Sequence, residues 1–161
     1  MILATIIKHC TCGNKLTFEV CCKPIIDGKV AAKNAETLMR SRFTAYSLKN
    51  YQYILQTYIL ALRSKLTISE LANSAKNTQW LSLQVIAHHF QANKAQVEFK
   101  AFYQIHNSYY VMHEISDFIL EAGTWLYADG VIKEDSGELS QDRNSQCLCG
   151  SGKKYKKCCG R

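Results

Sequence analysis

The chain has 161 residues, a formal net charge of +7, 47% hydrophobic residues and a single proline. This length and apolar content fit one packed domain with small appendages, and they exclude an intrinsically disordered chain. The longest apolar run, near residues 1–7, is too short to span a membrane. It also lacks the charged segment and the small-residue cleavage site of a secretory signal, so we expect a cytoplasmic protein.

All eight cysteines fall into two groups with the same internal spacing, one near each end of the chain. Each group reads Cys-x-Cys, then eight residues, then Cys-Cys. The first group is Cys10, Cys12, Cys21 and Cys22, and the second is Cys147, Cys149, Cys158 and Cys159. A glycine follows each Cys-x-Cys, at Gly13 and Gly150, where it suits a tight turn whose amides point at sulfur. Phe18 and Tyr155 are placed to cover the two loops.

The segment after the first cysteine group has helical periodicity. Apolar and aromatic side chains recur at spacings of three and four residues on both sides of a break at residues 49–50: Met39, Phe43, Tyr46, Tyr51, Leu55, Tyr58 and Leu62. Thr67 and Glu70 have the spacing of a capping box. We therefore predict a third, short helix that extends to about Ala75.

The periodicity then changes from helical to alternating. Strands are predicted near residues 81–87, 97–105, 109–121 and 124–129, with turns at 93–94, 107–108 and 122–123. In the second strand Val97, Phe99 and Ala101 alternate with polar residues, which is typical of a strand with one buried face. Helices followed by hairpin-linked strands indicate an α+β fold in which helices pack on a curved antiparallel sheet.

Four cysteines on a short loop match the tetrahedral coordination of a structural zinc ion, with Zn–S bonds of about 2.3 Å. We expect two Zn²⁺ ions, one per group, and a closed site of this kind stabilises structure instead of activating water. Four thiolates and one divalent ion leave each site negative, so loading both sites lowers the formal charge from +7 to +3. Disulfides are the main alternative, but adjacent cysteines cannot bridge each other without strain, and the cytoplasm is reducing. Redox sensing is a third interpretation.

The stretch CLCGSGKKYKKCCG, residues 147–160, resembles the SEC-C motif, a small zinc module. Five further segments extend the resemblance to the YchJ family over essentially the whole chain: CTCGNKLTFEVCC (10–22), LMRSRFTAY (38–46), TQWLSLQVIAHH (78–89), HEISDF (113–118) and GTWLYADG (123–130). The resemblance implies a bacterial cytoplasmic protein, and it implies no particular biochemical activity. It also implies a middle domain similar to nuclear transport factor two, a cone of helices against a bent antiparallel sheet.

On this basis we expect four parts: an N-terminal SEC-C-like zinc module at 1–26, an α+β domain at 27–132, a polar linker at 133–144 and a C-terminal SEC-C module at 145–161. The SEC-C motif commonly ends in histidine, whereas Cys159 makes this site all-sulfur. The N-terminal copy has Thr17 and Glu19 where the C-terminal copy has lysines. A role of those lysines is therefore not transferred to the N-terminal copy.

Lysines surround the second cysteine group: Lys153, Lys154, Lys156 and Lys157. One interpretation is a docking surface for an acidic partner, such as ribosomal RNA, anionic lipid or an acidic protein. The alternative is that the lysines balance the negative charge of the metal site and keep the module soluble.

Folds of this cone shape have a cavity between sheet and helices, and Arg42, His113, Glu114 and Asp117 are the candidate residues for it. In an extended strand His113 and Asp117 share one face and Glu114 lies on the other, so no single catalytic pair contains all of them. Arg42 and Glu114 are also compatible with a buried ion pair that orients a helix on the sheet.

The sequence has no nucleophile elbow, phosphate-binding loop or open metal triad. We therefore predict a non-enzymatic zinc protein whose C-terminal module contacts a macromolecular partner, a protein or the ribosome or another nucleic acid. The alternative is a small-molecule-binding protein, or an acid–base enzyme that uses the cavity with Glu114 or Asp117 as base.

Overall fold

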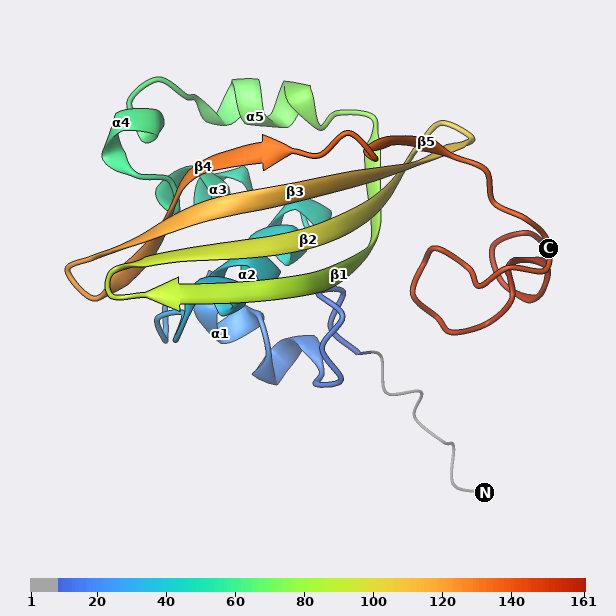
Figure 1. The fold of residues 1–161 in the computed structure, drawn as a ribbon, viewed down its shortest axis with the longest axis horizontal. Helices are drawn as coiled ribbons and strands as arrows, with labels where there is room; N and C mark the ends of the chain where they lie inside the picture. The colour runs from blue at the N-terminus through green and yellow to red at the C-terminus, as the bar shows by residue number, and fades with distance from the viewer. Residues whose placement is uncertain (1–8) are drawn as a thin grey trace.

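The computed structural model describes residues 9–161 and shows helices packed against one face of a curved antiparallel sheet (Figure 1). The apolar run at residues 1–7 lies outside the described residues. The cysteine loops lie at the two ends of the described chain, one beneath β1 and one beyond the end of the sheet (Figure 1). The predicted α+β architecture is confirmed.

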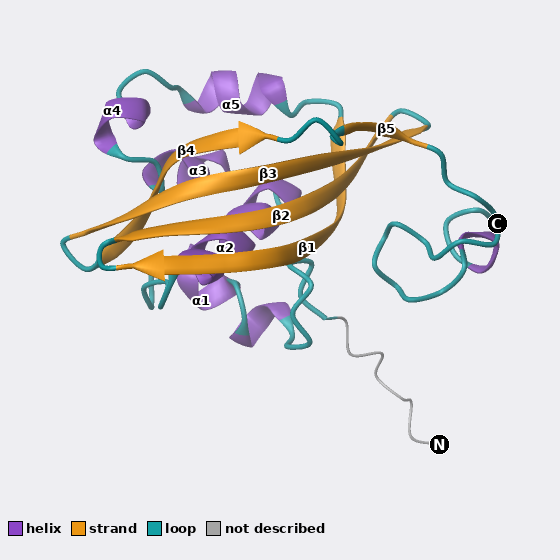
Figure 2. Ribbon diagram, in the orientation of Figure 1, coloured by secondary structure: helices purple, strands orange, loops and turns teal. Residues whose placement is uncertain are grey.

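Helices and strands follow the predicted order, helices first and strands second (Figure 2). The helical elements are η1 (Phe18–Val20), α1 (Lys23–Ile26), α2 (Ala35–Ser47), α3 (Tyr51–Gln56), α4 (Leu60–Arg63), α5 (Ile68–Ser74) and η2 (Tyr155–Lys157). The strands are β1 (Thr78–Gln91), β2 (Lys94–Ile105), β3 (Ser108–Glu121), β4 (Thr124–Ile132) and β5 (Gly137–Leu139).

Helix α2 begins and ends at capping structures that its own sequence provides. The side chain of Asn34 accepts a hydrogen bond of 2.8 Å from an amide in the first turn. At the other end Lys49 adopts a left-handed φ of 58°, and the amide of Asn50 donates to the carbonyl of Ala45 at 2.8 Å. This Schellman arrangement stops the helix, so the predicted break at residues 49–50 is confirmed.

The helical structure predicted over residues 51–62 is present at 51–56 and 60–62 but is interrupted at 57–59. The chain leaves the helical path between α3 and α4, where it bonds to β4 instead. The amide of Ile59 donates to the carbonyl of Tyr127 at 2.9 Å, and the amide of Tyr127 donates to the carbonyl of Thr57 at 2.8 Å. These two bonds to the sheet take the place of helical backbone bonds.

The capping box predicted for α5 is confirmed. The hydroxyl of Thr67 accepts from the amide of Glu70 at 3.2 Å, and the Glu70 carboxylate accepts from the amide of Thr67 at 2.8 Å. The helix then extends to Ser74, with Ala75 as its C-cap. Both bonds satisfy amides that would otherwise lack a partner at the start of the helix.

The sheet has the order β1-β2-β3-β4, with every pair antiparallel, and β5 adds to the edge of β3 beyond the end of β4. β4 pairs with residues 114–121 of β3, and β5 pairs with residues 109–111. Residues 133–144, predicted as a linker, therefore contribute a strand to the sheet. The free backbone groups at the start of β3 explain why this polar segment becomes ordered there.

Two of the three hairpin turns lie one residue earlier than predicted, at residues 92–93 and 106–107, and the turn at 122–123 is confirmed. Ala92 and His106 both have a left-handed φ of 52°. Because the chain reverses at these residues, β2 begins three residues sooner and β3 one residue sooner than alternation alone indicated.

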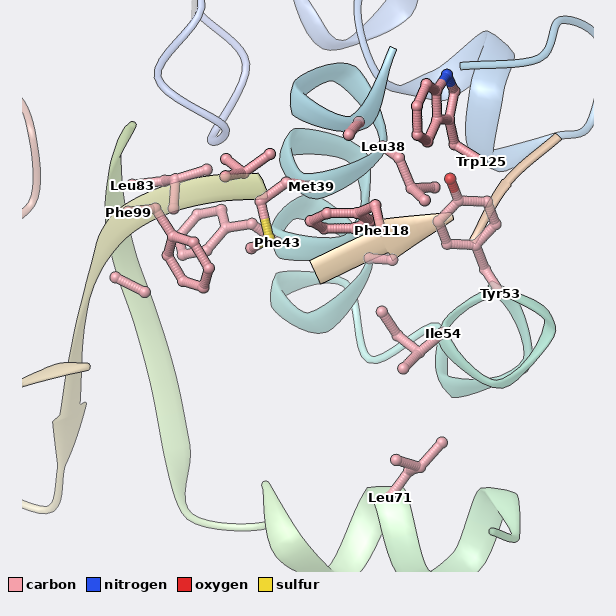
Figure 3. Packing of buried hydrophobic residues seen from close by; sticks show 14 of the residues in the cluster. Leu38, Met39, Phe43, Tyr53, Ile54, Leu71, Leu83, Phe99, Phe118 and Trp125 are labelled. Atoms are coloured by element: carbon pink, nitrogen blue, oxygen red, sulfur yellow. The ribbon is translucent and has the colours of Figure 1, made fainter. Parts of the chain in front are cut away.

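The core lies between α2 and the sheet. Figure 3 shows Leu38, Met39 and Phe43 of α2 pointing toward Phe99 and Phe118 of the strands. Phe99 and Phe118 are each 1% exposed, as expected for large side chains at the centre of a core. This packing holds α2 in place on the sheet. Helix α2 in turn contacts the N-terminal cysteine loop and forms one wall of a cavity.

Candidate metal centres

The N-terminal cysteines lie on a loop closed by backbone hydrogen bonds. The amide of Cys10 donates to the carbonyl of Leu16 at 2.8 Å, and the amide of Gly13 donates to the carbonyl of Cys10 at 3.1 Å. Gly13 has a φ of 85°, a left-handed conformation that glycine adopts without strain. η1 then reverses the chain, and Cys21 and Cys22 return to the first pair of thiols.

The C-terminal group repeats this backbone. The amide of Cys147 donates to the carbonyl of Lys153 at 2.8 Å, and the amide of Gly150 donates to the carbonyl of Cys147 at 3.2 Å. Gly150 has a φ of 77°, and η2 occupies the place that η1 has in the first loop. The shared cysteine spacing therefore folds into the same loop twice.

The sulfur atoms of both groups lie at distances that fit a tetrahedral metal ion. All four thiols of each group lie within 4.8 Å of one another. Individual Sγ–Sγ distances are 3.6 and 3.9 Å in the N-terminal group and 3.5 and 3.9 Å in the C-terminal group. With metal–sulfur bonds of about 2.3 Å, a tetrahedron has sulfur–sulfur edges of about 3.8 Å. All eight cysteines are free thiols, so no disulfide competes with metal binding in this structure.

The N-terminal thiols also share hydrogen bonds that shift their pKa values in opposite directions. Hydrogen bonds from the thiols of Cys12 and Cys22 lower the pKa of Cys10. The hydrogen bond with Cys10 raises the pKa of Cys12 to about 12, and a separate hydrogen bond with Cys10 raises the pKa of Cys22. One thiolate is thus stabilised at the expense of its neighbours. Four thiolates form together only when a positive ion balances their charge.

The N-terminal site is part of the folded core. Cys10, Cys12 and Cys22 are 3%, 0% and 1% exposed. Arg40 of α2 donates through Nη1 to the carbonyl of Cys12 at 2.7 Å, and the hydroxyl of Thr44 lies 3.7 Å from the sulfur of Cys10. A metal ion at this site would therefore tie the start of the described chain to the central helix.

The C-terminal site is peripheral by comparison. It is attached through the hydroxyl of Ser82, which donates to the carbonyl of Leu148 at 2.6 Å, and through an edge-on contact between the rings of Tyr109 and Tyr155. Cys159 is exposed, unlike the three buried cysteines of the N-terminal site. This loop projects beyond the end of the sheet (Figure 1).

The two loops contact successive residues of β1. A side-chain carbon at Gly13 would lie 2.8 Å from the carbonyl oxygen of Leu83, and one at Gly150 would lie 3.1 Å from Cβ of Ser82. Both glycine turns therefore approach the edge strand too closely for a larger residue. Sequence reasoning assigned these glycines to turns but missed their contact with the sheet.

The four lysines of the C-terminal loop, Lys153, Lys154, Lys156 and Lys157, are all exposed. None of them forms an ion pair within residues 9–161. The N-terminal loop differs, because Glu19 there pairs with Lys23 at 2.8 Å. The two loops thus share their cysteine geometry and differ in the charge of the surface around it.

A cavity of about 350 Å³ lies between α2 and the sheet. Seven of the residues that line it are aromatic: Phe43, Tyr46, Tyr58, Trp80, Phe99, Tyr103 and Tyr127. Two charged residues, Arg42 and Glu114, also line it, and they are only 4% and 8% exposed. Two of the four predicted cavity residues are therefore at the cavity.

The prediction of an ion pair between Arg42 and Glu114 was wrong, because Tyr127 lies between them. The Arg42 guanidinium carbon is 4.6 Å from the ring centroid of Tyr127 and 4.5 Å from that of Tyr58. The Glu114 carboxylate accepts from the hydroxyls of Tyr127 at 2.9 Å and Ser116 at 2.5 Å. Burial, followed by the nearby Glu114 charge, raises the pKa of Tyr127, so its hydroxyl stays protonated as the donor.

His113 and Asp117 share one face of β3, as predicted, but neither lines the cavity. His113 Nε2 lies 2.8 Å from Glu98, and Nδ1 lies 2.6 Å from Asp135 in the segment before β5. Asp117 accepts from Gln96 at 2.9 Å. These residues therefore bind neighbouring strands and the β5 segment on the opposite face of the sheet.

Sequence reasoning missed an aromatic row beside the cavity. Trp80, Tyr103 and Tyr110 are aligned across β1, β2 and β3. The ring centroids of Trp80 and Tyr103 are 5.3 Å apart, and those of Tyr103 and Tyr110 are 5.4 Å apart and stacked. The available signal was one aromatic residue within or directly before each of three predicted strands.

Comparison with known proteins agrees with these observations. Residues 34–130 match the family described as YchJ, middle NTF2-like domain, and residues 143–161 match the SEC-C motif. A SEC-C motif containing protein from Rhodopseudomonas palustris has a TM-score of 0.75 and 28% identity, covering 79% of this chain and 100% of that one. A second one, from Psychrobacter arcticus, has a TM-score of 0.69 and 32% identity, covering 96% of each chain. The fold and the cysteine loops thus define a SEC-C motif protein with an NTF2-like middle domain.

Relatives of similar length extend the match to nearly the whole chain. A UPF0225 protein of Vibrio cholerae is 38% identical over 153 residues, which cover 94% of this chain and 99% of the relative. A UPF0225 protein of Photorhabdus laumondii is 39% identical over 155 residues, covering 94% and 98%. The chain belongs to the YchJ (UPF0225) family. Among the helices of residues 9–161, none has the length and apolar content that a bilayer span requires.

Proposed function

We propose that each cysteine group binds one Zn²⁺ and that the chain acts in the cytoplasm as a non-enzymatic adaptor. Zinc is the metal proposed because four thiolates in a tetrahedral arrangement suit it, and because closed all-cysteine sites are typical structural zinc sites. In this proposal the ions hold the two loops in shape. The C-terminal loop then contacts an acidic macromolecule through Lys153, Lys154, Lys156 and Lys157.

The observation that carries the adaptor proposal is the contrast between the two loops. They have the same cysteine geometry, but the C-terminal loop has four exposed lysines without an ion-pair partner in the described part of the chain, whereas the N-terminal loop has one, Lys15. If lysines served only to balance the negative charge of the thiolates, both metal sites would need them equally, since both have four cysteines. The lysines therefore suit a function of the C-terminal loop alone, and attraction to an acidic surface is the simplest one.

The proposal is tested by recovering partners from a cell lysate at low salt with the zinc-loaded chain. We expect a captured macromolecule that is lost when Lys153 and Lys157 are both changed to glutamate, and that weakens steeply as salt is raised. A variant with Lys33→Glu and Lys76→Glu has the same charge change at exposed lysines elsewhere and is expected to behave as wild type. Nuclease treatment separates a nucleic acid from a protein partner. Equal recovery by both double variants would contradict the proposal.

A second candidate function is small-molecule binding in the cavity, with acid–base chemistry as its enzymatic form. It is favoured by the Glu114 carboxylate, which lines the cavity and is only 8% exposed. In the enzymatic form Glu114 is the only one of the two predicted bases that faces the cavity, since Asp117 lies on the opposite face of the sheet. This function is independent of the lysine surface, so the two candidates are tested separately.

A further inference from the structure

We infer that the cavity between α2 and the sheet binds a small, uncharged aromatic molecule with an amide-like edge, on which a hydrogen-bond donor lies beside an acceptor. The inference rests on the second candidate function and specifies its class of ligand. It depends on the shape of the cavity wall, on the unused hydrogen-bonding groups at its polar end, and on the charge balance there.

The wall of the cavity favours a flat aromatic body. The row of Trp80, Tyr103 and Tyr110 runs beside it, and Tyr46 contributes a further ring 5.8 Å from that of Trp80. Aromatic rings associate best in stacked or edge-to-face arrangements, which a flat ligand is able to continue. The volume of about 350 Å³ lies at the lower end of the range for ligand pockets, so it suits a molecule of one or two rings.

Glu114 and Arg42 provide an unused acceptor and unused donors. One carboxylate oxygen of Glu114, a residue that lines the cavity, accepts both of its hydrogen bonds, and the other oxygen has no partner within residues 9–161 and keeps some accessible surface. Arg42 donates to Ile54 and Thr57 through Nη1 alone among the described residues. A ligand donor placed on Glu114 and a ligand acceptor placed on Arg42 would satisfy both groups.

The charge balance of the polar end favours an uncharged ligand. Arg42 and Glu114 contact the same side chain, Tyr127, one through its ring and the other through its hydroxyl. A cation placed against Glu114 would be repelled by the nearby guanidinium, and an anion placed against Arg42 would be repelled by the carboxylate. Because an incompletely paired charge is costly to bury, a neutral group that hydrogen-bonds to both is preferred.

The ligand class is tested with four probes of similar size on the full-length, zinc-loaded chain: benzamide, methyl benzoate, benzoate and benzylamine. Benzamide has the neutral donor and acceptor, methyl benzoate lacks the donor, and the other two are charged. Dissociation constants are measured by titration calorimetry and by ligand-observed nuclear magnetic resonance. We expect benzamide to bind most tightly, and Glu114→Gln to weaken it by about tenfold because a hydrogen bond to a charged acceptor is lost.

Two further variants make the result specific. Asp117→Asn makes the same change of carboxylate to amide on the opposite face of the sheet and is expected to leave benzamide binding unchanged. Ala101, which lines the cavity and is 1% exposed, is changed to methionine to fill it, and binding is expected to be lost. Because Ala101→Met keeps Glu114, it still tests whether benzamide binds in the cavity if the Glu114→Gln chain does not fold.

The outcomes separate the ligand class from the function on which it rests. Tighter binding of benzoate, benzylamine or methyl benzoate than of benzamide would overturn the proposed class and leave the cavity as a binding site. Absence of binding by all four probes would overturn the class and the second candidate function together. Binding that persists in Ala101→Met would show that the probes bind elsewhere, which also overturns the inference.

Discussion

Replacing one cysteine in each loop should have unequal effects on the folded domain, although the two sites have the same ligands. In Cys12→Ser the site loses a ligand that is 0% exposed and whose carbonyl accepts a hydrogen bond from Arg40. In Cys149→Ser the affected loop is held mainly by Ser82 and by one aromatic contact. Each variant is expected to lose one metal ion. Only Cys12→Ser is expected to destabilise the α+β domain strongly.

The magnitude follows from the contacts that each loop makes. Metal ligation contributes roughly 10–16 kcal/mol to the folding of a small zinc module, so either loop is expected to unfold without its ion. Unfolding of the N-terminal loop removes the Arg40 hydrogen bond, worth about 1 kcal/mol. It also exposes apolar side chains such as Ile26, which packs on both the loop and the core, at about 1.5–3 kcal/mol each.

A total of about 3–5 kcal/mol corresponds to a decrease in Tm of about 10 °C for a chain of this size. The C-terminal loop is held by the hydrogen bond from Ser82, by a hydrogen bond of 3.3 Å from the hydroxyl of Tyr109 to that of Tyr155, and by the contact of those two rings, so its loss is expected to lower Tm by about 5 °C or less. The zinc content of each variant is measured by elemental analysis, and thermal unfolding of the domain is followed by circular dichroism. Equal decreases in Tm for the two variants, or an undiminished metal content in either, would refute the reasoning.

Three smaller perturbations test other parts of the structure. Thr67→Ala removes the capping box of α5 and is expected to cost about 1 kcal/mol in urea unfolding, whereas an unchanged midpoint would contradict this role. The Lys100 ammonium, followed by the His113 imidazole, lowers the pKa of Asp135 to about 2. The contacts of the Asp135 carboxylate therefore stabilise the fold fully above the ordinary pKa of Asp, and this stabilisation is lost as the pH falls toward 2. The Tm difference between wild type and Asp135→Asn should therefore shrink from pH 6 to pH 2, and a constant difference would count against the contact. Gly130→Ala places a methyl group against the Glu114 carboxylate and is expected to lower stability by about 1–3 kcal/mol and to weaken benzamide binding, while wild-type behaviour in both assays would argue against this packing.

Features encoded by neighbouring residues were predictable from the sequence. The repeated cysteine spacing predicts both loops because each loop is closed by hydrogen bonds within itself. The Thr67 capping box and the break before Asn50 depend on residues only three to five positions apart. The alternation in β2 was equally clear, because one face of that strand packs on α2.

Features that depend on distant contacts were not predictable in the same way. The helical spacing continues through Tyr58, but backbone bonds from the neighbouring residues to Tyr127 end the helix. β5 has a polar sequence and becomes a strand because the edge of β3 is free beside it. Arg42 and Glu114 were correctly associated with one cavity, yet Tyr127 from another strand separates them.

The central claim is that sulfur atoms of each loop bind a zinc ion, and metal analysis together with thiol titration tests it most directly. The full-length chain is purified without chelator, its zinc content is measured, and its thiols are titrated under native conditions. The two cysteine groups predict about two zinc ions per chain and thiols that react only after the metal is removed. A metal-free chain in which all eight cysteines react freely would contradict the claim.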